Sequence, residues 1–293
     1  MNFLLPARPP FKLSVVVNSH GWVQLAPFSH DKESDGFDYL MELTSGQVID
    51  LRVRPAASGE VQIGTTAALT RAEEEELIRR VTWMLGLDQD LTPFYDLARA
   101  EPKLAHVADQ ARGRILRSAA LFEDAVKTLC TVNTTWGGTR RMVRSLVEGY
   151  GAEWPGAPEQ RAFPSAARLA AASEQDLRTN AKLGFRAPFV LDLALAVAAG
   201  TVDLEALKES AAPTLEVRKQ LLAIKGVGDY AAANLLMILG RYDFIPVDSW
   251  ALKVVSKEWH DGQPIGRAEV EAAFAHWGEW LSLIHISEPT RPY

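Results

Sequence analysis

The residues with the clearest chemical potential lie between Ile224 and Trp250. A glycine-bracketed turn, Gly226-Val227-Gly228, separates two segments with the apolar spacing of helices. An isolated acid, Asp248, follows eighteen residues after Tyr230 in a Pro-Val-Asp step. Such a turn leaves unpaired backbone N–H groups at the start of its second helix, and these bind an anion without any basic side chain. The sequence therefore predicts a phosphate site and a carboxylate available for chemistry.

The turn residues have separate predicted tasks. We expect Gly226 to end the first helix and Gly228 to adopt a backbone conformation that is closed to larger residues. Asp229 is then placed to cap the second helix. An ordinary helical hairpin without a ligand is the alternative interpretation of the same pattern.

Asp248 follows Pro246 and precedes the helical pattern SWALKVVSKEW. The simplest interpretation is an N-cap aspartate. Capping and catalysis are compatible, because amide donors at the start of a helix keep a carboxylate ionised. A group that stabilises positive charge must be ionised.

The turn and the Pro246-Val247-Asp248 step together resemble the signature of the helix-hairpin-helix DNA glycosylase superfamily. The resemblance extends over residues 90 to 280, and it is strongest to the 8-oxoguanine and 3-methyladenine glycosylase II types. The segments that resemble the helical body of this superfamily are 94–113, 121–151 and 183–197.

The resemblance implies a role for each part of the motif. Asp248 would be the catalytic carboxylate, which stabilises the positive charge that develops on the sugar and orients the attacking water. The target base would first leave the duplex. The hairpin would grip DNA phosphates, and its backbone carbonyls would be able to hold a monovalent cation; no other cofactor is expected, and no metal bound by side chains. The hairpin residues are Ile224, Gly226, Val227 and Gly228.

Tyr230 departs from the pattern of relatives that also nick the backbone. Those relatives place a lysine there, whose amine attacks the sugar to form a Schiff base. Tyrosine cannot do so, and we therefore expect a monofunctional enzyme without lyase activity. Tyr230 is also a candidate to line the base pocket, with packing on the hairpin as the alternative.

Four further residues are candidates for the base pocket or for a wedge between bases. By resemblance, Asn133 in TVNTTW fills the gap left by the flipped base; the alternative is a loop residue that ends a helix. Phe185 and Arg186 in LGFRA resemble a wedge site, with a core phenylalanine beside a surface arginine as the alternative. Trp136 is a candidate to stack on an unusual base, or to pack in the interior.

Composition limits the class of protein. The 293 residues are 47% apolar, and no apolar run reaches the length that spans a membrane. The start, MNFLLPARPP, does not resemble a signal peptide. The single cysteine, Cys130, excludes an internal disulfide and an iron–sulfur cluster in these residues, and it lies in a core pattern. We expect a cytoplasmic protein, associated with the nucleoid if the source is bacterial.

The net charge of −6 argues mildly against a nucleic-acid partner. The distribution of charge softens that argument, because residues 103–144 hold eight basic and three acidic residues, a local charge of +5. The local field, and not the total, steers DNA. The basic residues are Lys103, Arg112, Arg114, Arg117, Lys127, Arg140, Arg141 and Arg144.

The expected fold class is α+β. Residues 1–89 are predicted to form a small antiparallel β-sheet domain with a linking helix, and FKLSVVVN, QVIDLRV and EVQIG are its expected strands. Thr70 and Glu73 form a capping box for the linking helix. Residues 90–280 are predicted to form a helical glycosylase domain of two subdomains, with the helix-hairpin-helix at 215–240. The end, 281–293, resembles a translated sequencing adapter and is expected to be non-native.

The sequence thus predicts a base-excision repair glycosylase. Its expected partner is double-stranded DNA with a damaged base, an alkylated or oxidised purine, and we expect a monomer without membrane association. A mismatch-specific glycosylase is one alternative. A non-catalytic helix-hairpin-helix DNA-binding protein is another, although the intact Asp248 disfavours it.

Overall fold

A five-stranded antiparallel sheet forms the N-terminal part of the computed structural model, which describes residues 1–102, 104–244, 247 and 249–283. The alternation of apolar residues with others along the chain explains β4, because Ile49, Leu51 and Val53 are fully buried on one face of the strand. The expected strands QVIDLRV and EVQIG correspond to β4 and β5. In spatial order, the strands are β1 (Asn2–Pro6), β5 (Glu60–Gly64), β4 (Val48–Pro55), β3 (Gly36–Glu42) and β2 (Ser29–Asp31).

The segment FKLSVVVN was expected to be a strand, and this prediction is wrong. It contains the short helix α1 (Leu13–Val17), in which Leu13, Val16 and Val17 are buried. Their i, i+3, i+4 spacing brings them to one side only if the segment is helical. Valine favours strands, but packing against β3 and β4 decides the conformation here.

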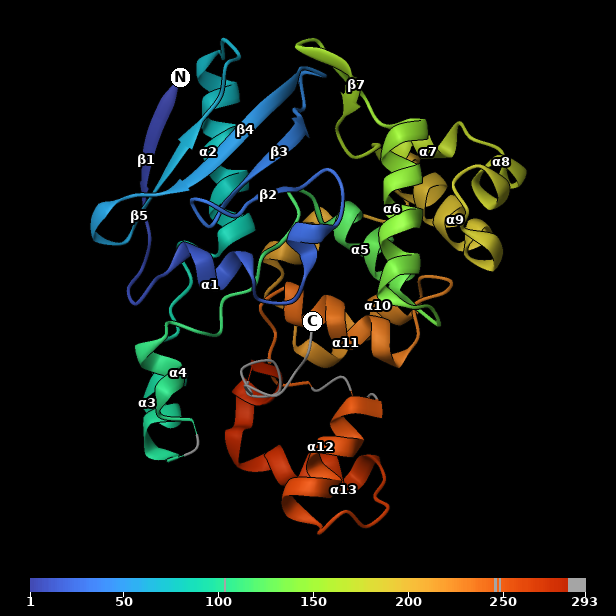
Figure 1. The fold of residues 1–293 in the computed structure, drawn as a ribbon. Helices are drawn as coiled ribbons and strands as arrows, with labels where there is room; N and C mark the ends of the chain where they lie inside the picture. The colour runs from blue at the N-terminus through green and yellow to red at the C-terminus, as the bar shows by residue number, and fades with distance from the viewer. Residues whose placement is uncertain (103, 245–246, 248, 284–293) are drawn as a thin grey trace.

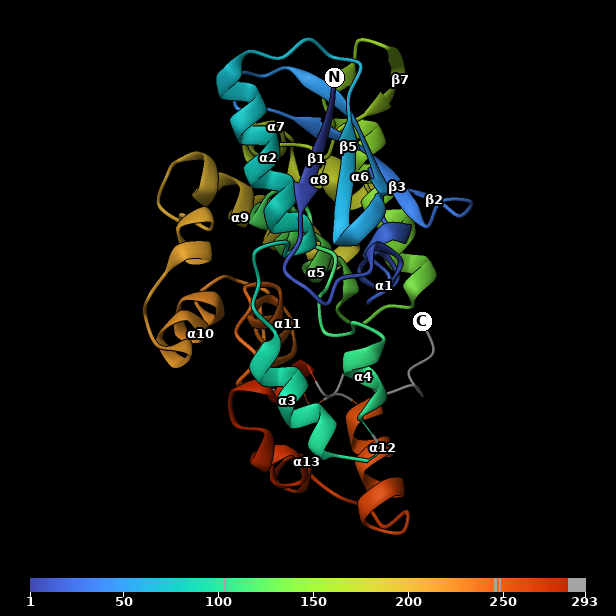
Figure 2. The same ribbon diagram turned by 90° about the vertical axis from the view of Figure 1, so that its left-hand side faces the viewer.

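The linking helix α2 (Arg71–Leu85) lies against the sheet (Figures 1 and 2). The Thr70 hydroxyl accepts a hydrogen bond from the Glu73 N–H, and the Glu73 carboxylate accepts one from the Thr70 N–H. The predicted capping box is therefore confirmed. Gly86 ends the helix in the left-handed region, at φ 57°.

The rest of the described chain is mainly helical, so the predicted α+β fold class is confirmed. Its helices are α3 (Thr92–Ala100), α4 (His106–Asp109), α5 (Leu121–Thr131), α6 (Trp136–Tyr150), α7 (Ala166–Ala170), α8 (Glu174–Thr179), α9 (Ala187–Ala198), α10 (Thr214–Leu222), α11 (Asp229–Ile238), α12 (Ser249–Trp259) and α13 (Arg267–Phe274). Shorter elements are the 3-10 turns η1 (Trp22–Gln24), η2 (Ala57–Gly59), η3 (Gly184–Arg186), η4 (Glu205–Glu209) and η5 (Ala275–Trp280), and the hairpin β6 (Glu153–Trp154) and β7 (Ala157–Arg161).

The helices fall into two groups in Figure 1. Helices α5 to α11 lie beside and below the sheet, and α3, α4, α12 and α13 lie farther below. The chain therefore enters the lower group twice. The rings of Phe94 in α3 and Trp280 in η5 hold the two passes together, with their centroids 5.8 Å apart.

A buried ionic cluster joins α5 to the sheet. The Lys127 ammonium is fully buried, and it lies 2.6 Å from Oε1 of Glu123. Tyr39 of β3 donates a hydrogen bond to the same carboxylate, and the Trp22 indole N–H donates one to Asp124 at 2.7 Å. Burial raises the pKa of both Glu123 and Asp124. Sheet and helices are thus tied together by groups that are costly to leave unpaired.

One buried apolar cluster runs from Leu5 to Leu283, through both the sheet and the helices. Of the tail that was expected to be non-native, Leu283 is buried, and the Ser282 N–H donates to the Tyr242 carbonyl at 2.8 Å. Residues 284–293 of that tail lie outside the described residues. Within the part of the chain that the structure describes, no helix is long and apolar enough to cross a membrane.

Candidate DNA-binding and catalytic site

The glycine turn connects α10 to α11, which pack against each other. Ile224 and Val227 point their side chains into the core and are buried. Gly226 has φ +85°, in the left-handed region, and a Cβ placed on it would lie 2.6 Å from Cγ of Phe189 in α9. Both observations require glycine at position 226.

Three expectations about the turn need correction. Gly228 has φ −92° and ψ −174°, which is extended backbone that any residue adopts, and it is itself the N-cap of α11. Asp229 does not cap the helix, because it is the first helical residue. Its carboxylate instead forms an ion pair with Arg218 of α10. The first helix also ends earlier than expected, with Ala223 as its C-cap.

The backbone at the start of α11 is suited to an anion. The N–H groups of Gly228, Asp229 and Tyr230 have no hydrogen-bond acceptor among the residues that the structure describes. Free N–H groups at a helix start attract negative charge. Arg218 pairs with the Asp229 carboxylate beside them and so offsets its negative charge.

Backbone carbonyl oxygens, which attract positive charge, are available one step earlier in the turn. The carbonyl oxygens of Lys225 and Gly226 accept no hydrogen bond from any described residue. Unpaired carbonyls are suitable ligands for a hard monovalent cation. The hairpin therefore fits the cation that the resemblance implies.

The predicted catalytic carboxylate, Asp248, lies outside the described residues. The chain on either side is described in part: Val247 packs partly buried against the core, and α12 begins at Ser249. Phe244 lies between two cations, with the Arg218 guanidinium 4.7 Å and the Arg267 guanidinium 5.6 Å from its ring centroid. Arg218 thus contacts both the hairpin and the segment that leads to the acid, a role with no local signal in the sequence.

The Asn133 loop connects α5 to α6. Asn133 is exposed and has φ +49°, a left-handed conformation that asparagine tolerates better than most residues. The Arg186 guanidinium donates to the carbonyls of both Val132 and Asn133, the second at 3.1 Å. These bonds hold the tip of the loop in place.

The alternative interpretation, a core phenylalanine beside a surface arginine, has the exposure of Phe185 and Arg186 reversed. Phe185 is 49% exposed, whereas Arg186 is 6% exposed and lies with its guanidinium 4.2 Å from the Phe185 ring centroid. Arg186 therefore positions its neighbours, and only Phe185 presents an apolar surface to a partner.

Contacts between α9 and its neighbours bring the hairpin and the Asn133 loop to the same helix. Phe189 packs under Gly226, and one turn earlier Arg186 holds Asn133. Tyr230, at the start of α11, follows the hairpin directly and is 37% exposed. The hairpin, the Tyr230 ring and the Asn133 amide thus all lie around the beginning of α9.

Trp136 is half-buried and already engaged. Its indole N–H donates to Oε1 of Gln24 at 2.9 Å, and its ring packs so close to Gly21 that a Cβ there would lie 2.9 Å away. It anchors the first turn of α6 to the N-terminal region, which is the packing role considered in the sequence.

The basic segment 103–144 is less available to a partner than its charge suggests. Arg114, Arg117 and Lys127 are buried, and the Arg114 guanidinium donates to four backbone carbonyls. Arg140, Arg141 and Arg144 of α6 remain exposed. Lys103 lies outside the described residues.

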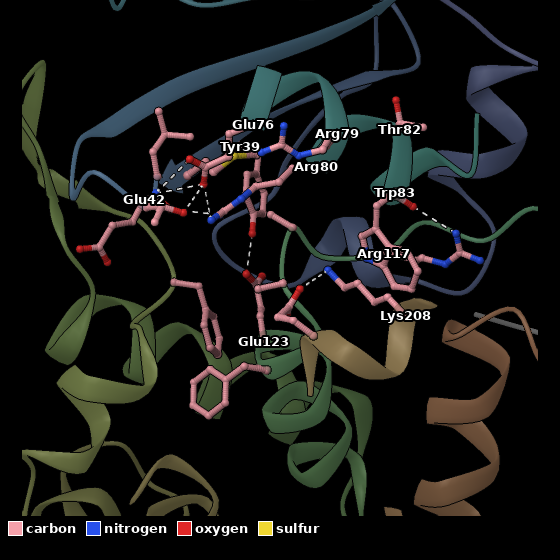
Figure 3. Close-up of a pocket in the computed structure, with 18 of the residues that line it drawn as sticks. Tyr39, Glu42, Glu76, Arg79, Arg80, Thr82, Trp83, Arg117, Glu123 and Lys208 are labelled. Atoms are coloured by element: carbon pink, nitrogen blue, oxygen red, sulfur yellow. Dashed lines mark hydrogen bonds and ion pairs between the residues drawn. The ribbon is translucent and has the colours of Figure 1, made fainter. Parts of the chain in front are cut away.

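A cavity of about 1210 Å³ is lined by residues of β3 and α2 together with residues of α5 and η4 (Figure 3). None of the predicted site residues that the structure describes lines it. On one side, Trp83 is in contact with two cations, Arg117 and Lys208, each 4.5 Å from its ring centroid. Gly240, at the end of α11 that is remote from the hairpin, is part of the wall. This cavity is therefore separate from the hairpin site.

Solved structures share the fold over almost the whole chain. The 3-methyladenine DNA glycosylase of Archaeoglobus fulgidus superposes with a TM-score of 0.75 at 20% identity, covering 98% of this chain and 96% of its own. The 8-oxoguanine glycosylase/lyase of Clostridium acetobutylicum gives 0.74 at 18% identity without DNA, covering 98% and 94%. Its complex with double-stranded DNA gives 0.71 at 20% identity, covering 95% and 90%. The chain therefore has the fold of these DNA glycosylase structures, as its sequence resemblance predicts.

By sequence, the chain is similar to the DNA-3-methyladenine glycosylase of Bacillus subtilis (strain 168). The two are 27% identical over 215 residues, which are 72% of this chain and 70% of the relative. No family model matches the sequence.

Proposed function

We propose that this protein is a DNA glycosylase of base-excision repair, which removes a damaged base from duplex DNA by hydrolysing its N-glycosidic bond. The observation that carries the proposal is the α10–α11 hairpin, where three free N–H groups meet an enforced glycine turn. This hairpin occurs in a chain that matches glycosylase structures along nearly its full length. DNA phosphate is the anion that such a hairpin would bind in these enzymes.

In the proposed mechanism, the hairpin anchors the strand and the target base leaves the stack. Positive charge builds on the sugar as the bond to the base lengthens, and the Asp248 carboxylate stabilises it. Water then adds to C1′ and the base departs with a proton. The products are a free base and an abasic site. A monovalent cation on the Lys225 and Gly226 carbonyls would strengthen the attraction for phosphate.

We further propose that the enzyme is monofunctional. Tyr230 occupies the position where a lyase would place its amine, and its phenol cannot form a Schiff base. The side chain is exposed at the start of α11, and the Tyr230 carbonyl accepts a hydrogen bond from Asn234 at 2.9 Å. Tyr230 is therefore available to contact a base.

The proposed substrate is a damaged purine, with an alkylated purine as the first choice. The similar Bacillus subtilis protein and the Archaeoglobus fulgidus structure are both named for 3-methyladenine. An oxidised purine is the second choice, because the Clostridium acetobutylicum enzyme is named for 8-oxoguanine.

The test measures base release from duplexes that carry an alkylated purine, 8-oxoguanine or a mismatch. We expect release of the alkylated purine, and a decrease of about 100-fold or more in Asp248→Asn. Asp243→Asn, an exposed acid in the same segment, is the control and should retain activity. Release only from mismatches would support the mismatch enzyme instead.

Three further results would each contradict part of the proposal. If Asp248→Asn is as active as the wild type, Asp248 has no part in the mechanism. An adduct trapped by borohydride, together with strand nicking, would show that the enzyme is a lyase after all. Binding of duplex DNA without release of any base would indicate a non-catalytic DNA-binding protein.

A further inference from the structure

The exposed side of α6 carries three arginines that lack an acidic partner among the residues that the structure describes. Arg140, Arg141 and Arg144 are exposed, and no hydrogen bond or ion pair joins their side chains to any residue in the described ranges. Glu148 lies one turn beyond Arg144, at the spacing that favours an ion pair, yet the two are not paired. These guanidinium groups are therefore free for an external anion.

Several exposed arginines on other helices are paired within their own helix, whereas Arg79 of α2 is, like those of α6, exposed without a partner among the described residues. Arg71 lies 3.1 Å from Glu75 in α2, and Arg267 lies 2.6 Å from Glu271 in α13. The protein as a whole has a net charge of −6, so an unpaired basic surface stands out as a local source of positive potential.

The position of α6 relates this surface to the proposed reaction. The helix begins three residues after Asn133, whose proposed role is to meet the base that loses its partner. At 1.5 Å per residue, Arg140 and Arg141 lie about 6 to 8 Å along the axis from the start of α6. Arg144 lies farther on and lines a cavity of about 520 Å³ beside the sheet. The first two arginines are thus the ones near the loop.

The chemistry of the surface favours phosphate over a protein partner. A guanidinium group presents a planar fork of donors that matches phosphate. No large apolar side chain of α6 is exposed, and protein interfaces depend on buried aromatic or aliphatic anchors at their centre.

We propose that Arg140 and Arg141 bind phosphates of the DNA strand opposite the damaged base. The inference rests on the proposed function, and on the role that the resemblance gives to Asn133, which is to fill the gap left by the flipped base. It adds a second attachment to DNA, made by side chains, to the backbone attachment at the hairpin. The two attachments would hold the two strands separately while one nucleotide is turned out.

The test is the salt dependence of binding. Affinity for a duplex with an abasic-site analogue is measured by fluorescence anisotropy, from 50 to 300 mM salt, for the wild type and for Arg140→Gln/Arg141→Gln. Each lost phosphate contact lowers the slope of log affinity against log salt by about 0.9. We expect a slope that is lower by about 2 and affinity that is about tenfold weaker near 100 mM salt. An unchanged slope would overturn the proposal.

The strand is identified with neutral backbones. Methylphosphonate linkages placed in the strand opposite the analogue should weaken wild-type binding and remove the difference between wild type and variant. If the same linkages remove that difference only when they lie in the damaged strand, the assignment to the opposite strand is wrong.

Two controls separate the possible failures. Arg71→Gln/Arg99→Gln changes the charge equally on other helices, at side chains that are 92% and 55% exposed, and it should leave the slope unchanged; an equal effect would mean that net charge alone is responsible, and it would refute the proposal. Base release by the wild type reports on the proposed function independently. Release with an unaffected slope in the α6 variant would refute this inference and leave the function in place.

Discussion

At the scale of single residues, the two glycines of the turn differ in what they do. Gly226 is required by the fold, because its φ is +85° and Phe189 leaves no room for a Cβ. Gly228 has an extended backbone, and a Cβ added there meets nothing within 4 Å. The fold therefore does not explain Gly228. The open space beside it borders the free N–H groups of α11, where a phosphate would lie.

This contrast predicts different outcomes for two alanine variants. Gly226→Ala should lower the free energy of unfolding by about 1–3 kcal/mol, from backbone strain and the contact with Phe189. Gly228→Ala should keep the free energy of unfolding within about 0.5 kcal/mol of wild type, and it should bind duplex DNA more weakly. Urea titration and fluorescence anisotropy measure the two quantities. Wild-type affinity in Gly228→Ala would mean that no phosphate approaches position 228.

At the scale of elements, α5 shows how a helix can be recognised while its environment is misjudged. Its first turn carries Glu123 and Asp124, with Lys127 four residues after Glu123. That spacing is typical of a solvated surface, but all three side chains are buried. The field expected from residues 103–144 was overestimated for the same reason, because Lys127 serves the interior.

The α5 cluster predicts an asymmetric mutational response. Lys127→Met should cost about 3–5 kcal/mol, because it leaves the Glu123 carboxylate buried without its cation. Lys127→Met/Glu123→Leu should recover part of that loss, because the Glu123 carboxylate is no longer left buried without its cation. Chemical denaturation of both variants measures the difference; a double variant less stable than the single one would contradict the prediction.

The pH response of Lys127→Met follows from the same cluster. Burial raises the pKa of Glu123, so the folded state retains this proton to higher pH than the unfolded state. The stability associated with that proton is present at low pH and is lost as the pH rises through the folded-state pKa. Lys127 lowers the pKa of Glu123, so Lys127→Met should raise that pKa further than in the wild type. The deficit of Lys127→Met should therefore become smaller as the pH is lowered.

At the scale of the whole molecule, the N-terminal sheet is connected to the helices by buried polar bonds as well as by apolar packing. The Arg114 guanidinium donates to the carbonyls of Arg8 at 2.8 Å and Pro10 at 2.7 Å. Tyr39 and Trp22 reach the acids of α5. Separating the two parts would break these bonds and expose the apolar surface around them to water.

We accordingly predict that residues 1–89 do not fold alone. A fragment of that length should show no cooperative urea transition by circular dichroism, whereas the full chain should. The sheet would otherwise expose the apolar face that now packs on the helices. A cooperative transition in the fragment would show that the sheet is an independent domain.

The sequence by itself determined the features that a few neighbouring residues encode. The capping box of Thr70 and Glu73, the strands β4 and β5, and the glycine hairpin with its superfamily resemblance are of this kind. Each depends on local backbone preferences and on spacing along the chain, which a single sequence contains in full.

Only the tertiary structure decided which side chains face solvent. Arg186 reads as a surface residue, but it is buried because it binds Asn133, 53 residues away. Lys127 is buried beside Glu123, which accepts a hydrogen bond from Tyr39 of the sheet. Arg140 and Arg141 on the next helix are exposed to solvent. Burial and pairing depend on segments distant in the chain, and the energy of a buried charge depends on those partners far more than on its neighbours in sequence.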